Sequence, residues 1–357
     1  MERTISEEST LADADDGSCG SLPAYTNLPL FGPPSKTLPK PPHPYKTGWR
    51  FKAHIHSPPE PTPVVYDCCT SDRRGRAERY QVSPIERCQR HPPLPGLTGT
   101  GTLELEIQKL LQTGDGYQTQ VFTVTLCGSS GFQSDYEWEI PSQTELVAKV
   151  FDPLYFNDDG GYLDPFRCMD KFYTHAAGAF RALLDFQGRG IPCYYGSYSI
   201  CLPLPDTPDV CREVRMILME FIPGAPMSQF RPDQLSQPIR QKILYTILDL
   251  ESHIYEKDIS LIDLAPRNVM LDRIDQQEPL IVFIDFDDSL FQRNEDDSIL
   301  DVSERFLGQY ISPLLRWRDL PHEFEKWVDW NWVLWLESEF SHTKSTITPE
   351  MREAWEI

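Results

Sequence analysis

The distribution of proline constrains this chain more than any other feature, because half of its 32 prolines lie within residues 1–100. Proline fixes φ and lacks a backbone N–H, so dense prolines prevent helices and central strands. Most of them fall in "LPLFGPPSKTLPKPPHPYKTG" and "HSPPEPTPVV". We therefore predict a largely disordered tail over residues 1–100 and an ordered domain over residues 101–357. PxxP-like spellings in the tail would also suit docking on a partner domain, although a plain extended tail is commoner.

Composition and charge exclude several classes of protein. Hydrophobic residues make up 40% of the chain, and no apolar run approaches the roughly 18 residues that span a bilayer. The net charge of −21 repels nucleic acid. The acidic start "MERTISEEST" is unlike a secretory signal. We expect an intracellular protein, cytoplasmic or nuclear, with no nucleic-acid or membrane partner. The nine cysteines form no CxxC pair, so we expect reduced thiols.

Hydrophobic periodicity beyond residue 101 predicts strands first and helices later. Alternating, β-branched stretches predict strands, and apolar residues at helical spacing predict a helix over 166–186 and another near 232–258. The tryptophan-rich stretch 324–340 predicts a buried helix face. The predicted strands are 120–128, 144–152, 194–204 and 213–224, and residues 103–112 are predicted as a strand or as a short helix entering a strand.

Two polar stretches carry the chemistry. In "SLIDLAPRNVMLD" an aspartate, Asp263, lies five residues before Asn268, and "IVFIDFDDS" ends an apolar run on Asp285 and Asp287. Carboxylate and amide oxygens are the ligands that Mg²⁺ prefers. A further carboxylate beside such a site suits the positioning of an attacking hydroxyl. This pattern predicts phosphoryl transfer, although Asp285 taken alone is equally typical of an ordinary turn.

The order of these motifs resembles the protein-kinase-like superfamily, particularly its divergent fungal members. The resemblance covers about Leu103 to the C-terminus. It implies an α+β, two-lobed protein-kinase-like fold, with a small β-rich N-lobe over about 101–222 and a helical C-lobe over about 223–357. It also implies ATP and Mg²⁺ as cofactors and a hydroxyl-bearing protein or small molecule as acceptor.

The resemblance assigns a role to each matching residue. Asp263 would orient and deprotonate the acceptor hydroxyl, Asn268 and Asp285 would hold magnesium, and Asp287 would add a metal contact. Lys149 in "LVAKVF" would face the α- and β-phosphates, although a lone lysine on a strand is more often a surface residue. The remaining matches are Gly114, Gly116 and Val121 in a glycine-rich phosphate loop, Met219 as the gatekeeper, and Glu220 and Ile222 at the adenine.

Four departures leave a second function open. Leu261 replaces the histidine that braces the catalytic loop, and Thr119 replaces the third glycine of the phosphate loop. Ala176 stands where the helix glutamate would pair with Lys149. Asp287 replaces the glycine after Asp285-Phe286 and is similar to the aminoglycoside and choline kinase branch. The leading prediction is an ATP-dependent phosphotransferase, and the alternative is a pseudokinase that binds nucleotide or acts as a scaffold.

Overall fold

A computed structural model describes residues 40–64, 68–131, 140–141, 144–157, 161–204, 210–274, 276, 279–291 and 306–355. All of them fall within one compact unit. Residues 1–39 of the predicted tail lie outside the described residues.

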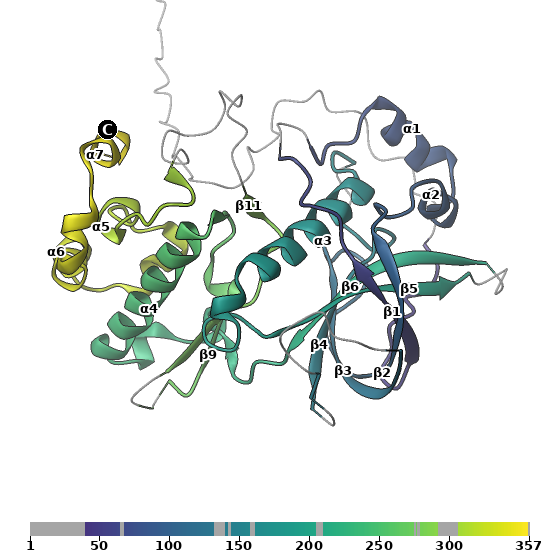
Figure 1. The fold of residues 1–357 in the computed structure, drawn as a ribbon, viewed down its shortest axis with the longest axis horizontal. Coiled ribbons are helices and arrows are strands. Elements are labelled where there is room, and N and C mark those ends of the chain that lie inside the picture. The colour runs from purple at the N-terminus through teal and green to yellow at the C-terminus, as the bar shows by residue number, and fades with distance from the viewer. Residues whose placement is uncertain are drawn as a thin grey trace, which may run out of the picture. The chain divides into compact units, whose positions relative to one another are not determined.

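The β-structure of the first half is a closed antiparallel barrel in the order β1-β2-β3-β4-β6-β5 (Figure 1). Alternating burial along β1 and β2 points every second side chain into the barrel. The strands are β1 (Arg50–Ser57), β2 (Leu97–Gln112), β3 (Gln120–Ser130), β4 (Leu146–Phe151), β5 (Tyr194–Pro203) and β6 (Cys211–Glu220).

This barrel contradicts the predicted two-lobed protein-kinase-like fold, which was wrong. The expected small sheet began near Leu103, but β1 pairs with β2 on one side and β5 on the other, which closes the sheet. The prediction of an unstructured tail also fails from Lys40 onwards, where β1 and two helices lie. Strand β1 is a proline-free window between Pro44 and Pro58 with alternating apolar residues, and the surrounding prolines concealed it.

The barrel is filled by an aliphatic and aromatic core with one buried ion pair. Arg212 on β6 holds Asp152 in a two-pronged contact of 2.6 and 2.8 Å, and the Tyr45 hydroxyl donates to Asp152 at 2.7 Å. Burial, and then the Asp152 charge, raise the pKa of Tyr45 well above its ordinary value. Every polar atom of this network that is buried needs its partner, so the network fixes how the barrel is packed.

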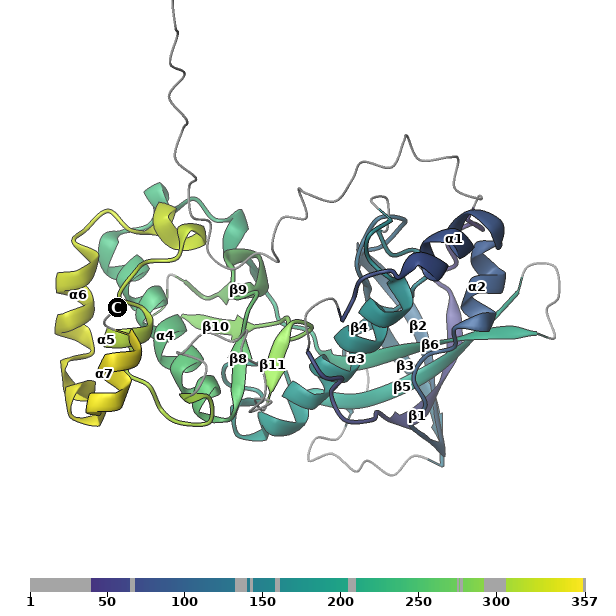
Figure 2. The ribbon, with the colours of Figure 1, turned by 90° about the horizontal axis from the view of Figure 1, so that it is seen from above.

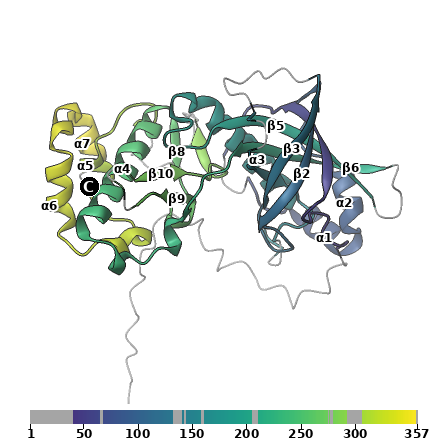
Figure 3. The same cartoon turned by 90° about the horizontal axis from the view of Figure 1, so that it is seen from below.

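Three helices pack around the barrel: α1 (Arg73–Gln81), α2 (Pro84–Arg90) and α3 (Pro165–Ala182). Each begins at a polar side chain that caps a backbone N–H, namely Asp72, Ser83 and Asp164. Helix α2 contacts β6 (Figure 3), while α3 contacts β4, β5 and β6. Helix α3 also contacts β11 (Ser289–Phe291), so it joins the barrel to the second half of the chain.

The second half is mainly helical, with two small antiparallel sheets (Figure 2). One sheet has the order β10-β9-β7, and the other pairs β11 with β8. The further α-helices are α4 (Gln237–Glu256), α5 (Pro313–Arg316), α6 (Trp332–Glu339) and α7 (Pro349–Trp355). The short strands are β7 (Ala225–Pro226), β8 (Ile259–Leu261), β9 (Val269–Asp272) and β10 (Leu280–Phe283). The 3-10 helices are η1 (Leu184–Phe186), η2 (Met227–Gln229), η3 (Pro232–Gln234), η4 (Pro266–Asn268), η6 (His322–Trp327) and η7 (Ser341–Thr346).

The tryptophan-rich stretch is buried, as predicted. Trp327, Trp332 and Trp335 join the hydrophobic core, and Trp330 packs against it under the Arg240 guanidinium, 5.3 Å from the ring centre. The stretch is divided between η6 and α6 rather than forming one continuous helix.

The cysteines differ from the expectation of free thiols at one pair. Cys201 and Cys211 form a disulfide between the ends of β5 and β6, with Cα atoms 5.6 Å apart. Strand pairing across the hairpin brings these positions close, which spacing along the sequence does not reveal.

Of the helices in the described ranges, none combines the length and hydrophobicity that a bilayer span needs.

Candidate active site

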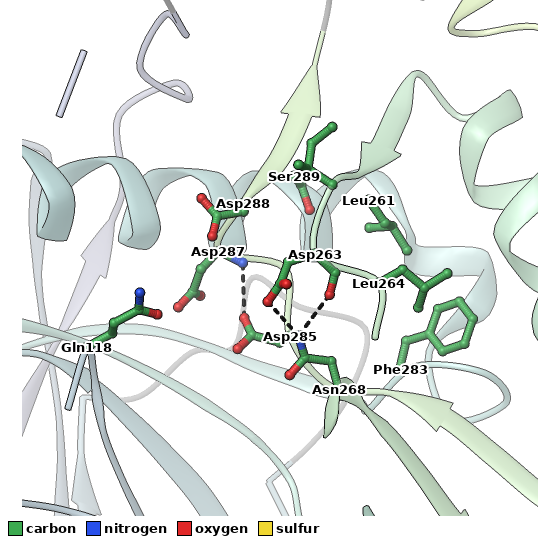
Figure 4. A pocket seen from close by; sticks show the side chains of 11 residues that line it. Gln118, Leu261, Asp263, Leu264, Asn268, Phe283, Asp285, Asp287, Asp288 and Ser289 are labelled. Atoms are coloured by element: carbon green, nitrogen blue, oxygen red, sulfur yellow. Dashed lines mark hydrogen bonds between the residues drawn. The ribbon is translucent and has the colours of Figure 1, made fainter. Parts of the chain in front are cut away.

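An acidic pocket lies where the barrel meets the two small sheets (Figure 4). Its empty volume is about 430 Å³ and it is open to solvent. One lining residue comes from the turn between β2 and β3, and the others come from two segments of the second half. The lining residues are Gln118, Leu261, Ile262, Asp263, Leu264, Asn268, Phe283, Asp285, Asp287, Asp288 and Ser289.

Strand pairing places the two chemical segments side by side. Leu261 of β8 pairs with Ser289 of β11, and Val269 of β9 pairs with Phe283 of β10. The loop that carries Asp263 connects β8 to β9, while the loop after Phe283 connects β10 to β11. Two loops that join the same two pairs of strands must lie next to each other. These loops therefore bring Asp263, Asn268, Asp285 and Asp287 to one pocket, and the roles assigned to them stay predictions.

Asp263 and Asn268 form a small hydrogen-bonded unit. The Asn268 side-chain amide donates to the Asp263 carboxylate and to the Asp263 carbonyl, both at 2.9 Å. The Arg267 guanidinium pairs with the other carboxylate oxygen of Asp263. Because the Asn268 nitrogen is committed to Asp263, its amide oxygen remains for a cation or a ligand, as dashed lines in Figure 4 make clear. The Asp263 side chain is 44% exposed, so a molecule in the pocket can reach it.

Lys149 is paired with both aspartates of the second loop. Its ammonium lies 2.8 Å from Asp285 and 2.7 Å from Asp287, and its side chain is only 5% exposed. Burial disfavours the charge on Lys149, but the two carboxylates outweigh burial and raise its pKa. Lys149 reaches this position from β4, between Val121 of β3 and Ile217 of β6.

The two aspartates respond differently to the same lysine. For Asp285 burial opposes ionisation, but the Lys149 charge and hydrogen bonds lower its pKa. For Asp287 burial and then the Asp285 charge raise the pKa well above its ordinary value, and Lys149 offsets this only in part. The Lys149 charge thus favours the ionised form of Asp285, whereas burial and the Asp285 charge disfavour the ionised form of Asp287.

Asp287 also has a buried oxygen without a partner. Among the described residues, nothing donates a hydrogen bond to its Oδ1 atom. A buried polar atom left unpaired costs about 1–3 kcal/mol, and more if charged. The oxygens of Asp285, Asp287 and Asn268 are hard donors of the type that Mg²⁺ takes, so the donor set fits a divalent cation. Within the described ranges no three His, Cys, Asp or Glu side chains form a ready metal cluster, and Lys149 holds both carboxylates.

Helix α3 reaches the site through a residue that the sequence analysis did not single out. Ala176 is buried and offers no charge to Lys149, in keeping with the departure noted in the sequence. Instead Lys171 of α3 donates to Asp288 at 2.7 Å. Burial opposes the charge on Lys171, but Asp288 raises its pKa. No local pattern marks this pair, because its members are 117 positions apart.

The predicted glycine-rich loop is the turn between β2 and β3. Gly114 and Gly116 have φ of 127° and 92°, which side chains with a Cβ rarely adopt. In the described part of the chain neither glycine lines the pocket, and nor does Val121, which packs against the core. Gln118 of the same turn does line it, and sequence reasoning missed this residue.

The predicted adenine contacts lie outside the acidic pocket as described. Glu220 exchanges two hydrogen bonds with Cys193, one through its backbone N–H at 2.9 Å and one through its carboxylate at 3.0 Å. Met219 and Ile222 are buried. The adenine roles of Glu220 and Ile222 stay predictions.

Comparison with known proteins gives little beyond this geometry. No protein-family model matches the chain, and no curated protein matches it by sequence. Among solved structures, the PknI kinase domain of Mycobacterium tuberculosis is similar over 51% of this chain, with a TM-score of 0.32 and 14% identity. The match spans 59% of that chain.

Proposed function

We propose that the acidic pocket transfers a phosphoryl group from ATP to a hydroxyl, with the help of a divalent cation. The observation that carries this proposal is the meeting of Asp263, Asn268, Asp285 and Asp287 in one open pocket with a buried lysine behind it. An exposed carboxylate beside a hard-donor cation site suits phosphoryl transfer, because the cation neutralises phosphate charge while the carboxylate positions the hydroxyl.

Each residue has a task that follows from its surroundings. Asp263 accepts the hydrogen bond of the acceptor hydroxyl and aligns that oxygen with the phosphorus. Its present partner Arg267 is exposed and held by a surface pair, which an acceptor can displace at small cost. Asn268, Asp285 and Asp287 would hold the cation, which neutralises phosphate charge when bound. Lys149 supplies a fixed positive charge on the barrel side of the pocket.

A pseudokinase remains the second candidate, and two observations favour it. Lys149 already contacts the carboxylates of both Asp285 and Asp287, so its single positive charge offsets part of their negative charge before any metal binds. Leu261 also lines the pocket where a histidine would brace the catalytic loop. In this alternative the pocket binds nucleotide or a partner without turnover.

The deciding experiment is a phosphate-transfer screen against protein substrates and hydroxylated small molecules. Asp263→Asn keeps the size of the side chain, so it should leave ATP binding nearly unchanged while lowering turnover at least about 100-fold. Asp285→Asn should weaken binding of magnesium–ATP as well as turnover. Wild-type protein that binds magnesium–ATP in a thermal-shift assay but transfers phosphate to no substrate would support the pseudokinase. Equal ATP affinity in EDTA and in magnesium would argue against the cation site.

A further inference from the structure

The segment Lys40–Tyr45, here called the N-terminal arm, lies against the β2–β3 turn. Lys40 reaches across to Asp115 of the turn at 2.5 Å and to the Phe156 carbonyl at 3.3 Å. The Lys40–Asp115 pair is exposed on the Asp115 side, so it contributes little by itself. The arm is therefore held against the turn mainly by contacts that its later residues make.

The strongest contact runs through a buried glutamine. Gln120 has no exposed surface, and its side-chain amide pairs with both backbone groups of Gly114. The Gly114 N–H donates to Gln120 Oε1 at 2.7 Å, and Gln120 Nε2 donates to the Gly114 carbonyl at 3.0 Å. His43 Nε2 lies 2.9 Å from the same Oε1, which must accept, so His43 carries its proton on Nε2. His43 thereby adds a hydrogen bond from the arm to the amide that holds the turn.

A second route anchors the other glycine. The Gly116 N–H donates to the Tyr155 carbonyl at 3.1 Å. The Tyr155 hydroxyl donates to the Pro42 carbonyl of the arm at 3.0 Å, and the His43 ring packs edge-on against Tyr155 with centroids 5.2 Å apart. The arm itself is anchored where Tyr45 donates to Asp152 inside the barrel. Both glycines of the turn are thus linked to the arm through one intermediate residue each, Gln120 for Gly114 and Tyr155 for Gly116.

We propose that the N-terminal arm is a positioning element that sets the β2–β3 turn, and with it Gln118, at the acidic pocket. His43 is the positioning residue. Gln118 lies between Gly116 and Gln120 and extends to the pocket beside Asp287 (Figure 4), so its place depends on the turn that the arm holds. The consequence for nucleotide binding rests on the proposed function, whereas the mechanical link between arm and turn does not. Without the arm, a turn with two glycines at positive φ would sample many conformations.

The test compares His43→Ala with His43→Gln and His54→Ala in the full chain. His43→Gln keeps an N–H donor, and His54 is an exposed histidine on β1 that serves as the matched control. In His43→Ala, hydrogen–deuterium exchange over residues 112–120 should quicken about threefold to tenfold, the range expected for one lost hydrogen bond. His43→Gln should restore most of the protection, and His54→Ala should match wild type.

ATP kinetics of the same variants distinguish a positioning role of His43 from a general loss of structure. If the turn orders the phosphates, His43→Ala should raise the KM for ATP about threefold to tenfold and change kcat less than twofold. Unchanged exchange over 112–120 in His43→Ala would overturn the arm–turn link. Faster exchange in His43→Ala with an unchanged KM for ATP would overturn the role of the N-terminal arm at the pocket. A wild-type protein that binds no nucleotide would refute the proposed function, and exchange would still decide the link.

Discussion

Replacing Lys149 with methionine should destabilise the metal-free protein by about 3 kcal/mol, the low end for removing one partner of a buried ion pair. Methionine keeps the length of the side chain but leaves Asp285 and Asp287 facing each other without a cation. Asp287 is only 10% exposed and carries most of the penalty, whereas Asp285 is 34% exposed and partly screened by water. For a protein of this size the loss corresponds to a fall in Tm of roughly 4–5 °C, because the unfolding entropy is about 2.1 cal/mol/K per residue.

The loss should depend on pH in a defined direction. The pKa of Asp287 is already raised in the folded protein, and Lys149 is the group that opposes this rise. Without Lys149 the pKa of Asp287 rises further. A carboxyl with a raised folded-state pKa contributes stability at low pH, which is lost as the pH rises through that pKa. Wild type behaves oppositely at Asp285, whose lowered pKa gives stability that is lost as the pH falls. The difference in free energy of unfolding between wild type and Lys149→Met should therefore become smaller from pH 8 to pH 5.

Urea unfolding at pH 5, 6.5 and 8, with EDTA or with millimolar magnesium, measures both the loss of stability and its dependence on pH. Magnesium should recover part of the loss in Lys149→Met and have less effect on wild type, because the variant carboxylates are free to bind it. Lys52→Met is the matched control, since Lys52 forms an exposed pair with Glu104 and should cost under about 0.5 kcal/mol. The reasoning fails if Lys149→Met is no less stable than Lys52→Met, or if its deficit is the same at all three pH values.

Two further changes test the barrel. Arg212→Met should cost about 3–5 kcal/mol in urea unfolding because it strands Asp152, which has no exposed surface, and a cost below 1 kcal/mol would show that the pair is dispensable. Cys201→Ser should lower stability by up to about 3 kcal/mol, the loop entropy for a crosslink spanning 10 positions, and a reductant should have the same effect on wild type and none on the variant.

The sequence by itself determined the local chemistry of this protein. The five-residue interval from Asp263 to Asn268, the aspartates after an apolar strand and the lysine within an alternating strand are all local patterns, and the structure brings these residues together. Local periodicity also located α3, α4 and most strands of the barrel, because hydrogen bonding and side-chain alternation act over a few residues.

Only the tertiary structure decided the rest, because the decisive contacts join distant residues. Strand β1 closes the barrel by pairing with strands on both of its sides, although it lies among prolines that suggest a tail. Lys149 contacts Asp285 across 136 positions and Lys171 contacts Asp288 across 117, and no spacing along the chain predicts either contact. Burial favours a raised pKa at both Asp285 and Asp287, and the Lys149 charge and hydrogen bonds reverse the shift only at Asp285. Their spacing in the chain gives no hint of that difference, which arises from the hydrogen bonds that Asp285 accepts and from the like charges of Asp285 and Asp288 beside Asp287.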